Sequence, residues 1–183
     1  MSDKYQAMQA LIKNKNEFAE FVPCCGHSLN LVGKTAANSC IAAIRFFDFI
    51  QNLYVFFTAT PTRYALLTKK LASIDKNKRV YVLKNLNETR WSCRADATKA
   101  VVFGYDFIKE ALEEISNDLE QKDIVKIESK KLNESMCTLE VAFYAIFWND
   151  ILERFDLTSH LLQDPKIVLQ TAVNALNSLL LFV

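Results

Sequence analysis

The chain has 183 residues, of which 51% are hydrophobic, and it contains only three glycines and three prolines. This composition excludes disordered, collagen-like and low-complexity chains, and the length allows one domain, or one domain with part of a second, to bury its own core. The 22 Lys and Arg nearly balance the 21 Asp and Glu, so the net charge of +1 gives no reason to expect a nucleic-acid or membrane partner.

The first part of the chain is predicted to contain two helices and one strand. A short helix is expected over residues 4–15. Residues 18–22 alternate between apolar and polar before Pro23, which is typical of a short strand. After it, Ser28 is a plausible N-cap of a long helical stretch that runs toward Thr58. Because this stretch is apolar on two faces, we expect it at the centre of a bundle.

The middle of the chain is predicted to be helical around one long connection. Thr60 and Pro61 favour the start of a helix that ends near residue 73. Residues 75–88 form the longest irregular stretch. Helical spacing resumes near Trp91, with apolar residues at intervals of three and four up to Leu119. Gly104 is expected to divide this region into two helices.

The last part of the chain has the most regular helical spacing. Apolar residues follow each other at intervals of three and four over 141–155 and again over 169–183, and Asp164-Pro165 is expected to open the last helix. Two such helices with a short link form an antiparallel hairpin. The sequence therefore predicts a mainly α-helical bundle with a small strand-helix piece at its N-terminus.

Charge is distributed unevenly along the sequence. Residues 63–99 carry ten Lys or Arg against three Asp or Glu, whereas residues 100–160 carry six against thirteen. Charges on amphipathic helices usually form solvated faces. The alternative is a basic patch that contacts a polyanion, with these candidates: Lys76, Lys78, Arg79 and Lys84.

Cysteine usage and apolar windows indicate an intracellular protein. The five cysteines are odd in number and irregularly spaced, which is not typical of a disulfide framework. The opening residues lack the apolar segment of a signal peptide. Residues 41–57 are interrupted by polar and charged side chains, and residues 172–183 are too few to span a bilayer. We interpret both windows as core and expect no membrane partner.

The densest group of reactive residues is the segment 23–31, with the sequence PCCGHSLNL. Cys24 and His27 are expected where a helix begins, near free backbone N–H groups that favour phosphate. Tetrahedral zinc would need four ligands, and no second Cys/His pair follows. A Cys-His nucleophile would lack a partner to orient it. The plainer alternative is a pair of packed cysteines with a capped histidine.

A second group of residues lies in the basic stretch, at Thr89-Arg90-Trp91-Ser92-Cys93-Arg94. An indole between two guanidinium groups can stack on an unpaired base while the arginines hold the phosphates. A tryptophan at the start of a helix also serves as a core anchor, and composition alone favours that interpretation.

Taken in order, the two segments resemble motifs of the hAT-superfamily (hobo/Ac/Tam3) transposases. Residues 24–31 resemble the Cys-x-x-His-x-Leu-Asn-Leu motif, and residues 89–91 resemble the Thr-Arg-Trp motif some sixty residues later. The likeness is strongest to zinc-finger MYM-type-like and TTF-type proteins built on the same core, and it extends over about residues 1–183. The pair in this order is more specific than either motif alone.

This resemblance implies a role in DNA contact for a small set of residues. It aligns His27 with the family histidine near the scissile phosphate and Cys24 with the cysteine beside it. Arg90 and Trp91 match the pair that stabilises a flipped base, and Arg94 flanks them. These side chains and the basic patch are the expected DNA-binding residues.

The same resemblance implies that the chain is not an enzyme. It places a fragment of the RNase H-like catalytic core in residues 1–30 and an all-helical insertion domain, truncated at its C-terminus, in residues 31–183. The family cuts DNA with metal ions held by two Asp and one Glu, which would lie upstream of residue 1 and beyond Val183. We therefore expect no catalytic residues, no metal ligands and no cofactor.

Three functional hypotheses remain. The first is a nuclear, transposase-derived protein that retains DNA contact. The second is a protein-interaction or dimerisation module that uses the apolar helices of residues 138–183. The third is a truncated gene product without a function.

Overall fold

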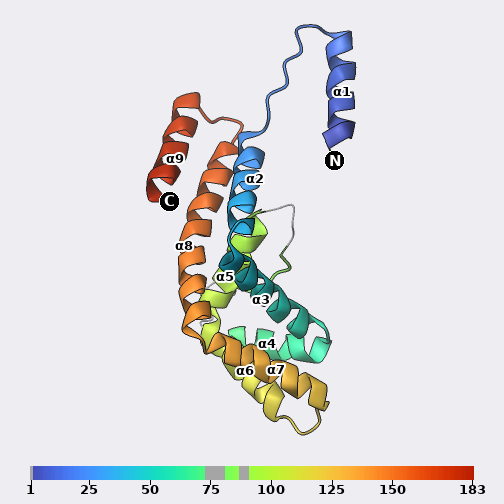
Figure 1. Cartoon of the computed structure of the whole chain (residues 1–183), viewed down its shortest axis with the longest axis vertical. Helices are drawn as coiled ribbons and strands as arrows, with labels where there is room; N and C mark the ends of the chain where they lie inside the picture. Colours follow the sequence, from blue (N-terminus) through green and yellow to red (C-terminus); the bar gives the residue numbers. More distant parts are fainter. Residues whose placement is uncertain (1, 73–80, 87–90) are drawn as a thin grey trace.

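The computed structural model describes residues 2–72, 81–86 and 91–183, with the backbone alone for residues 2–7 and 91. Within these ranges the chain forms nine α-helices and no strand, which confirms the mainly α-helical class. Figure 1 shows an elongated bundle with α8 along one side. The helices are α1 (Ser2–Lys15), α2 (Cys25–Asn38), α3 (Ile41–Thr58), α4 (Pro61–Ala72), α5 (Trp91–Phe103), α6 (Tyr105–Asn117), α7 (Asp123–Met136), α8 (Leu139–Leu162) and α9 (Leu169–Phe182).

The predicted strand over residues 18–22 is wrong, and so is the strand-helix piece of which it was part. The Phe18 amide donates to Asn16 Oδ1 at 3.1 Å, and the segment continues as irregular chain to α2. Alternating apolar and polar residues form a strand only where a neighbouring strand supplies hydrogen bonds, and the described residues contain no such neighbour. Among the described helices, α1 packs against none of the others (Figure 1).

The single helix expected over residues 28–58 is divided into α2 and α3. α2 begins earlier than expected, with Cys24 as its N-cap residue. It ends where Ser39 Oγ donates to the Ala36 carbonyl at 2.7 Å, a local hydrogen bond that competes with helix continuation. Cys40 is extended, with φ of −110° and ψ of 116°, so α3 starts in a new direction.

The two-faced apolar character of α3 places it at the centre of the bundle, as predicted. It contacts α2, α4, α5, α7 and α8, and its buried side chains are Ala43, Phe46, Phe47, Ile50, Leu53, Phe56 and Phe57. By length and hydropathy α3 could also cross a membrane, as could no other helix in the described chain, but a buried core helix meets the same criterion.

Helices α4, α6 and α7 form the lower end of the bundle in Figure 1. The predicted cap of α4 is confirmed, because Thr60 Oγ1 accepts from the amide three residues later at 3.4 Å. Gly104 separates α5 from α6, as predicted. Ser129 Oγ of α7 donates to the Leu112 carbonyl of α6 at 2.7 Å. Leu119 was expected on the apolar stripe of α6, but it is exposed beyond the end of that helix.

Helices α8 and α9 form the predicted antiparallel hairpin (Figure 1). Thr138 caps α8, since its Oγ1 accepts from the Val141 amide at 3.3 Å. The inner face of α8 packs against α2, α3, α5 and α7. The chain then turns at residues 164–168, and α9 begins at Leu169 rather than at Pro165.

Candidate interaction surface

The start of α2 holds the reactive residues of the first motif. Cys24 and His27 are both exposed, whereas Gly26 between them is buried. A Cβ atom at Gly26 would lie 3.1 Å from Cγ of Gln163 and 3.4 Å from the carbonyl oxygen of Ser159. This glycine therefore allows α2 to pack closely against the end of α8, which leaves the two reactive side chains on the surface.

The described residues provide no cluster suited to a metal ion. Within them, no three His, Cys, Asp or Glu side chains gather closely enough to hold one. All five cysteines are free, and four of them are exposed. The zinc alternative for residues 23–31 therefore has no further ligands in the described part of the chain.

The second motif and the basic patch are described only in part. Outside the described residues lie Arg90, Lys76, Lys78 and Arg79. Trp91 is the first residue of α5. The guanidinium carbon of Arg94 lies 4.5 Å from the Phe47 ring centroid, and Lys84 Nζ lies 2.6 Å from Asp96 Oδ2. Two of the predicted DNA-binding side chains thus make intramolecular contacts.

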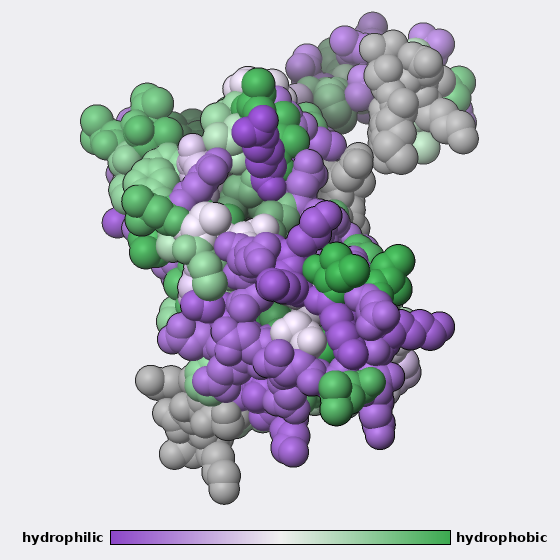
Figure 2. Space-filling view, turned by 60° about the horizontal axis from the view of Figure 1, so that its bottom comes forward, coloured by the Kyte–Doolittle hydropathy of each residue, from purple (hydrophilic) through white to green (hydrophobic). Residues whose placement is uncertain are grey.

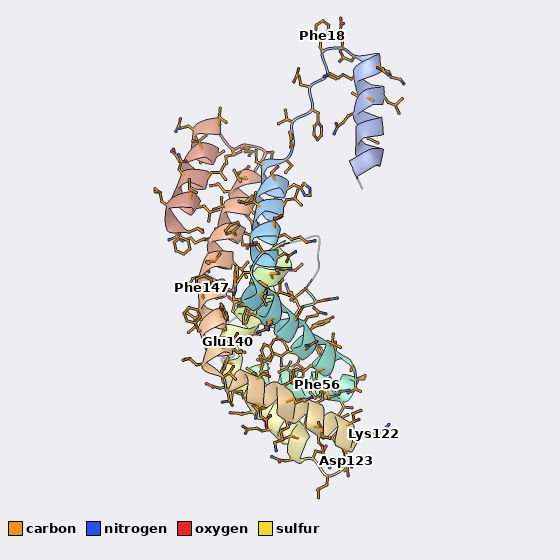
Figure 3. All side chains as sticks on the ribbon, viewed as in Figure 1. Phe18, Phe56, Lys122, Asp123, Glu140 and Phe147 are labelled. Atoms are coloured by element: carbon orange, nitrogen blue, oxygen red, sulfur yellow. The ribbon has the colours of Figure 1, made fainter. Side chains whose placement is uncertain are left out.

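Helix α8 is apolar on two opposite faces, and the bundle covers one of them. The inner face includes the buried Leu152 and Ala145. The opposite face carries six exposed residues spaced alternately four and three apart, which therefore lie on one line along the helix. We call them the outer stripe: Phe143, Phe147, Asp150, Arg154, Leu157 and Leu161. Its four apolar side chains are 39–62% exposed. Figure 3 shows Phe147 on the side of α8 away from α3.

The aromatic end of the outer stripe is supported by the core. Phe143 stacks on Phe147 with ring centroids 5.8 Å apart and an interplanar angle of 14°. Phe147 meets Trp148 edge to face at 5.5 Å, and Trp148 packs against Phe47 of α3 at 5.2 Å. The stacked and edge-to-face contacts are arrangements that aromatic rings prefer, and the tilted contact of Trp148 with Phe47 connects the exposed rings to the core.

Helix α9 enlarges the apolar surface beside the outer stripe. The interpretation of residues 172–183 as core is wrong for most of them: Leu179 is buried against the bundle, whereas Leu180 and Leu181 are exposed, as is Leu169 at the start of α9. The Phe182 ring centroid lies 5.0 Å from the guanidinium carbon of Arg154, which places the end of α9 beside the middle of the outer stripe. In Figure 2 hydrophobic side chains gather on the side where α9 lies, and hydrophilic ones cover the end formed by α6 and α7.

Charged groups on the flank of the inner face attach α8 to α5. Lys99 Nζ of α5 lies 3.1 Å from Glu153 Oε1 of α8, and this hydrogen bond raises the pKa of Lys99. Burial raises the pKa of Asp156 despite the attraction of His160, whose Nδ1 lies 3.4 Å from the carboxylate. Burial therefore destabilises the charged form of the Asp156 carboxylate.

The outer stripe was not identified from the sequence. An interaction role was expected for residues 138–183, but the apolar spacing traced over 141–155 belongs to the inner face, which the bundle covers. Two of the six residues of the outer stripe, Asp150 and Arg154, are charged, so a search for uninterrupted apolar spacing misses it. The signal that could have revealed it is that two apolar pairs and the charged pair between them keep the same alternation of four and three residues from 143 to 161.

Comparison with known protein families, curated proteins and solved structures found no match. The fold and surface define the class of this chain, which is an all-helical bundle in the part that the structure describes. One surface feature of that bundle is the outer stripe of α8.

Proposed function

We propose that this protein is a helical protein-interaction module and that the outer stripe is its contact surface. The observation that carries the proposal is the alignment of four large, exposed apolar side chains on the face of α8 opposite the core: Phe143, Phe147, Leu157 and Leu161. Single exposed apolar residues are ordinary on protein surfaces, but neighbouring ones that form patches mark interaction sites; the stripe has one apolar pair on each side of its charged centre.

The chemistry of the outer stripe supports a protein partner. Phenylalanine is enriched at the centres of protein interfaces, and Phe143 and Phe147 are held by ring contacts that reach the core. Burial of a fully exposed large apolar side chain contributes about 1.5–3 kcal/mol, and each of these four, which are already partly buried, would gain a part of that. Four such side chains can therefore offset part of the entropy lost on association.

A capture experiment with matched variants tests this function. The tagged wild type is compared with Phe143→Gln/Phe147→Gln and with the control Ile124→Gln/Ile127→Gln, which changes two exposed apolar residues of α7. We expect polypeptides, including untagged copies of this chain, to be retained by the wild type and the control and lost from the α8 variant. Equal retention by all three proteins would contradict the proposal.

A second function is supported by a different observation. Cys24 and His27 remain exposed at the start of α2, where free backbone N–H groups favour a phosphate. We propose that DNA contact inherited from an hAT-type transposase is retained there and around Trp91. Anisotropy of a labelled DNA end with an unpaired flanking base is the test. Binding that falls steeply with salt, and by about 1–3 kcal/mol in Trp91→Ala, is expected; no binding at low salt would contradict it.

A further inference from the structure

We propose that the outer stripe binds the outer stripe of a second copy of this chain, with the two α8 helices antiparallel. This inference rests on the proposed interaction function and names the partner. The arrangement of apolar and charged residues along the outer stripe supports this partner.

The spacing of the stripe is that of a helix-pairing seam. Two helices pack along their length when contact residues alternate at three and four positions, so that each turn presents a residue to the partner. The outer stripe keeps this alternation from Phe143 to Leu161, a distance of about 27 Å along a helix axis. Most of the exposed length of α8 can therefore take part in one continuous contact.

The order of residues along the stripe is the same in chemical type when it is read from either end. From each end there are two apolar residues, and a charged pair stands in the middle. An antiparallel pairing in the register that aligns the two stripes gives three contacts, each formed twice: Phe143 with Leu161, Phe147 with Leu157, and Asp150 with Arg154. The apolar residues meet apolar ones, and each carboxylate meets a guanidinium. A two-fold interface requires this kind of self-complementary surface.

Other arrangements of the same two helices lack this match. In a parallel pair each residue faces its own copy, so Asp150 meets Asp150 and Arg154 meets Arg154, and like charges that face each other are destabilising. An antiparallel shift of seven residues sets Asp150 against Phe147 and Arg154 against Phe143, which buries charges without partners. The charged pair therefore specifies both the direction and the register of the pairing.

The two charged side chains are available for this contact. In the described part of the chain neither Asp150 nor Arg154 belongs to an ion pair within 4 Å, and both are exposed. Arg154 lies against the Phe182 ring, which leaves its N–H groups free to donate at the edge of the plane. The guanidinium can keep this ring contact and still meet a carboxylate from the second copy.

Charge exchange tests the direction and register. Sedimentation equilibrium under reducing conditions compares the wild type with Asp150→Arg, with Arg154→Asp, with the double variant, and with an equimolar mixture of the two single variants. The control Lys130→Glu/Glu134→Lys exchanges an exposed pair of the same spacing on α7. Circular dichroism melts establish that each variant folds, which is expected because every changed side chain is exposed.

We expect the wild type and the control to dimerise and each single variant to associate at least about tenfold more weakly, because like charges then face each other twice. The double variant and the mixture recover wild-type association, since each restores opposite charges at both contacts. Single variants that dimerise as the wild type does, or a double variant that does not recover, would overturn the antiparallel register.

The outcomes also separate this inference from the function on which it rests. A wild type that remains monomeric at every concentration, while other polypeptides are still captured in a Phe147-dependent manner, would overturn the second copy as partner and leave the interaction function in place. A monomer that also captures nothing would overturn both.

Discussion

Helices α6 and α8 both carry apolar stripes, yet the bundle buries all of the stripe on α6 and only one of the two on α8. The apolar face of α6 is buried at Ile108, Ala111, Leu112 and Ile115, and its opposite face carries exposed glutamates. α8 is apolar on both faces, and only one of them is covered. The described bundle buries the apolar face of α6, whereas it leaves the outer stripe of α8 exposed. The predictions below test this difference.

The largest difference is expected between the two faces of α8 itself. Leu152→Ala removes a fully buried side chain and is expected to lower the free energy of unfolding by about 2–5 kcal/mol. Leu157→Ala on the outer stripe is expected to change it by less than about 0.5 kcal/mol in dilute solution. Urea denaturation at low protein concentration measures both. Equal losses would mean that the outer stripe is also part of the core.

The next largest loss of stability is expected at the junction between α5 and α6. A Cβ atom at Gly104 would lie 2.6 Å from Leu71 Cδ2, so Gly104→Ala forces Leu71 to move and is expected to cost about 1–3 kcal/mol. The same denaturation measurement checks this value. Unchanged stability would show that α4 has room to shift against α6.

A smaller loss is expected where α6 meets the end of α7. The Tyr105 hydroxyl donates to the Met136 carbonyl, and burial raises the pKa of Tyr105. Tyr105→Phe leaves that carbonyl without its donor and is expected to cost about 1–2 kcal/mol. A variant as stable as the wild type would indicate that water replaces the hydroxyl.

The smallest effect concerns Asp156 on the flank of the inner face, and it has the opposite sign. Because burial raises the pKa of this carboxyl group, its charged form is less stable in the folded chain than in the unfolded chain. Asp156→Asn is therefore expected to stabilise the fold at neutral pH by less than about 1 kcal/mol. The advantage should shrink as pH falls through the raised pKa, because wild-type Asp156 then becomes neutral. Thermal melts between pH 4 and 7 test this; a gain that grows toward low pH would contradict it.

Much of the fold could be predicted from the sequence because helical spacing is a local property. The division at Gly104, the cap at Thr60 and the final hairpin follow from residues close together in the chain. The end of α2 could not be predicted, since apolar spacing does not reveal that Ser39 Oγ donates to the Ala36 carbonyl. The prediction of a strand over residues 18–22 failed because a strand depends on a neighbouring strand, which its own sequence cannot reveal.

The candidate site could be predicted only in outline. Residues 138–183 were expected to offer apolar surface, but which face of α8 stays open depends on where α2, α5 and α9 pack. Exposure of Cys24 and His27 depends likewise on the packing of Gly26 against α8. Burial is a tertiary property, and spacing alone does not separate an inner stripe from an outer one.

We propose the outer stripe of α8 as the contact surface for a second copy. The most direct test is sedimentation equilibrium of the wild type and of Phe147→Gln over the same range of concentrations, with reductant present because four cysteines are exposed. We predict that the mass of the wild type rises from one chain to two while the variant stays at one. Equal masses for the two proteins at every concentration would contradict the account.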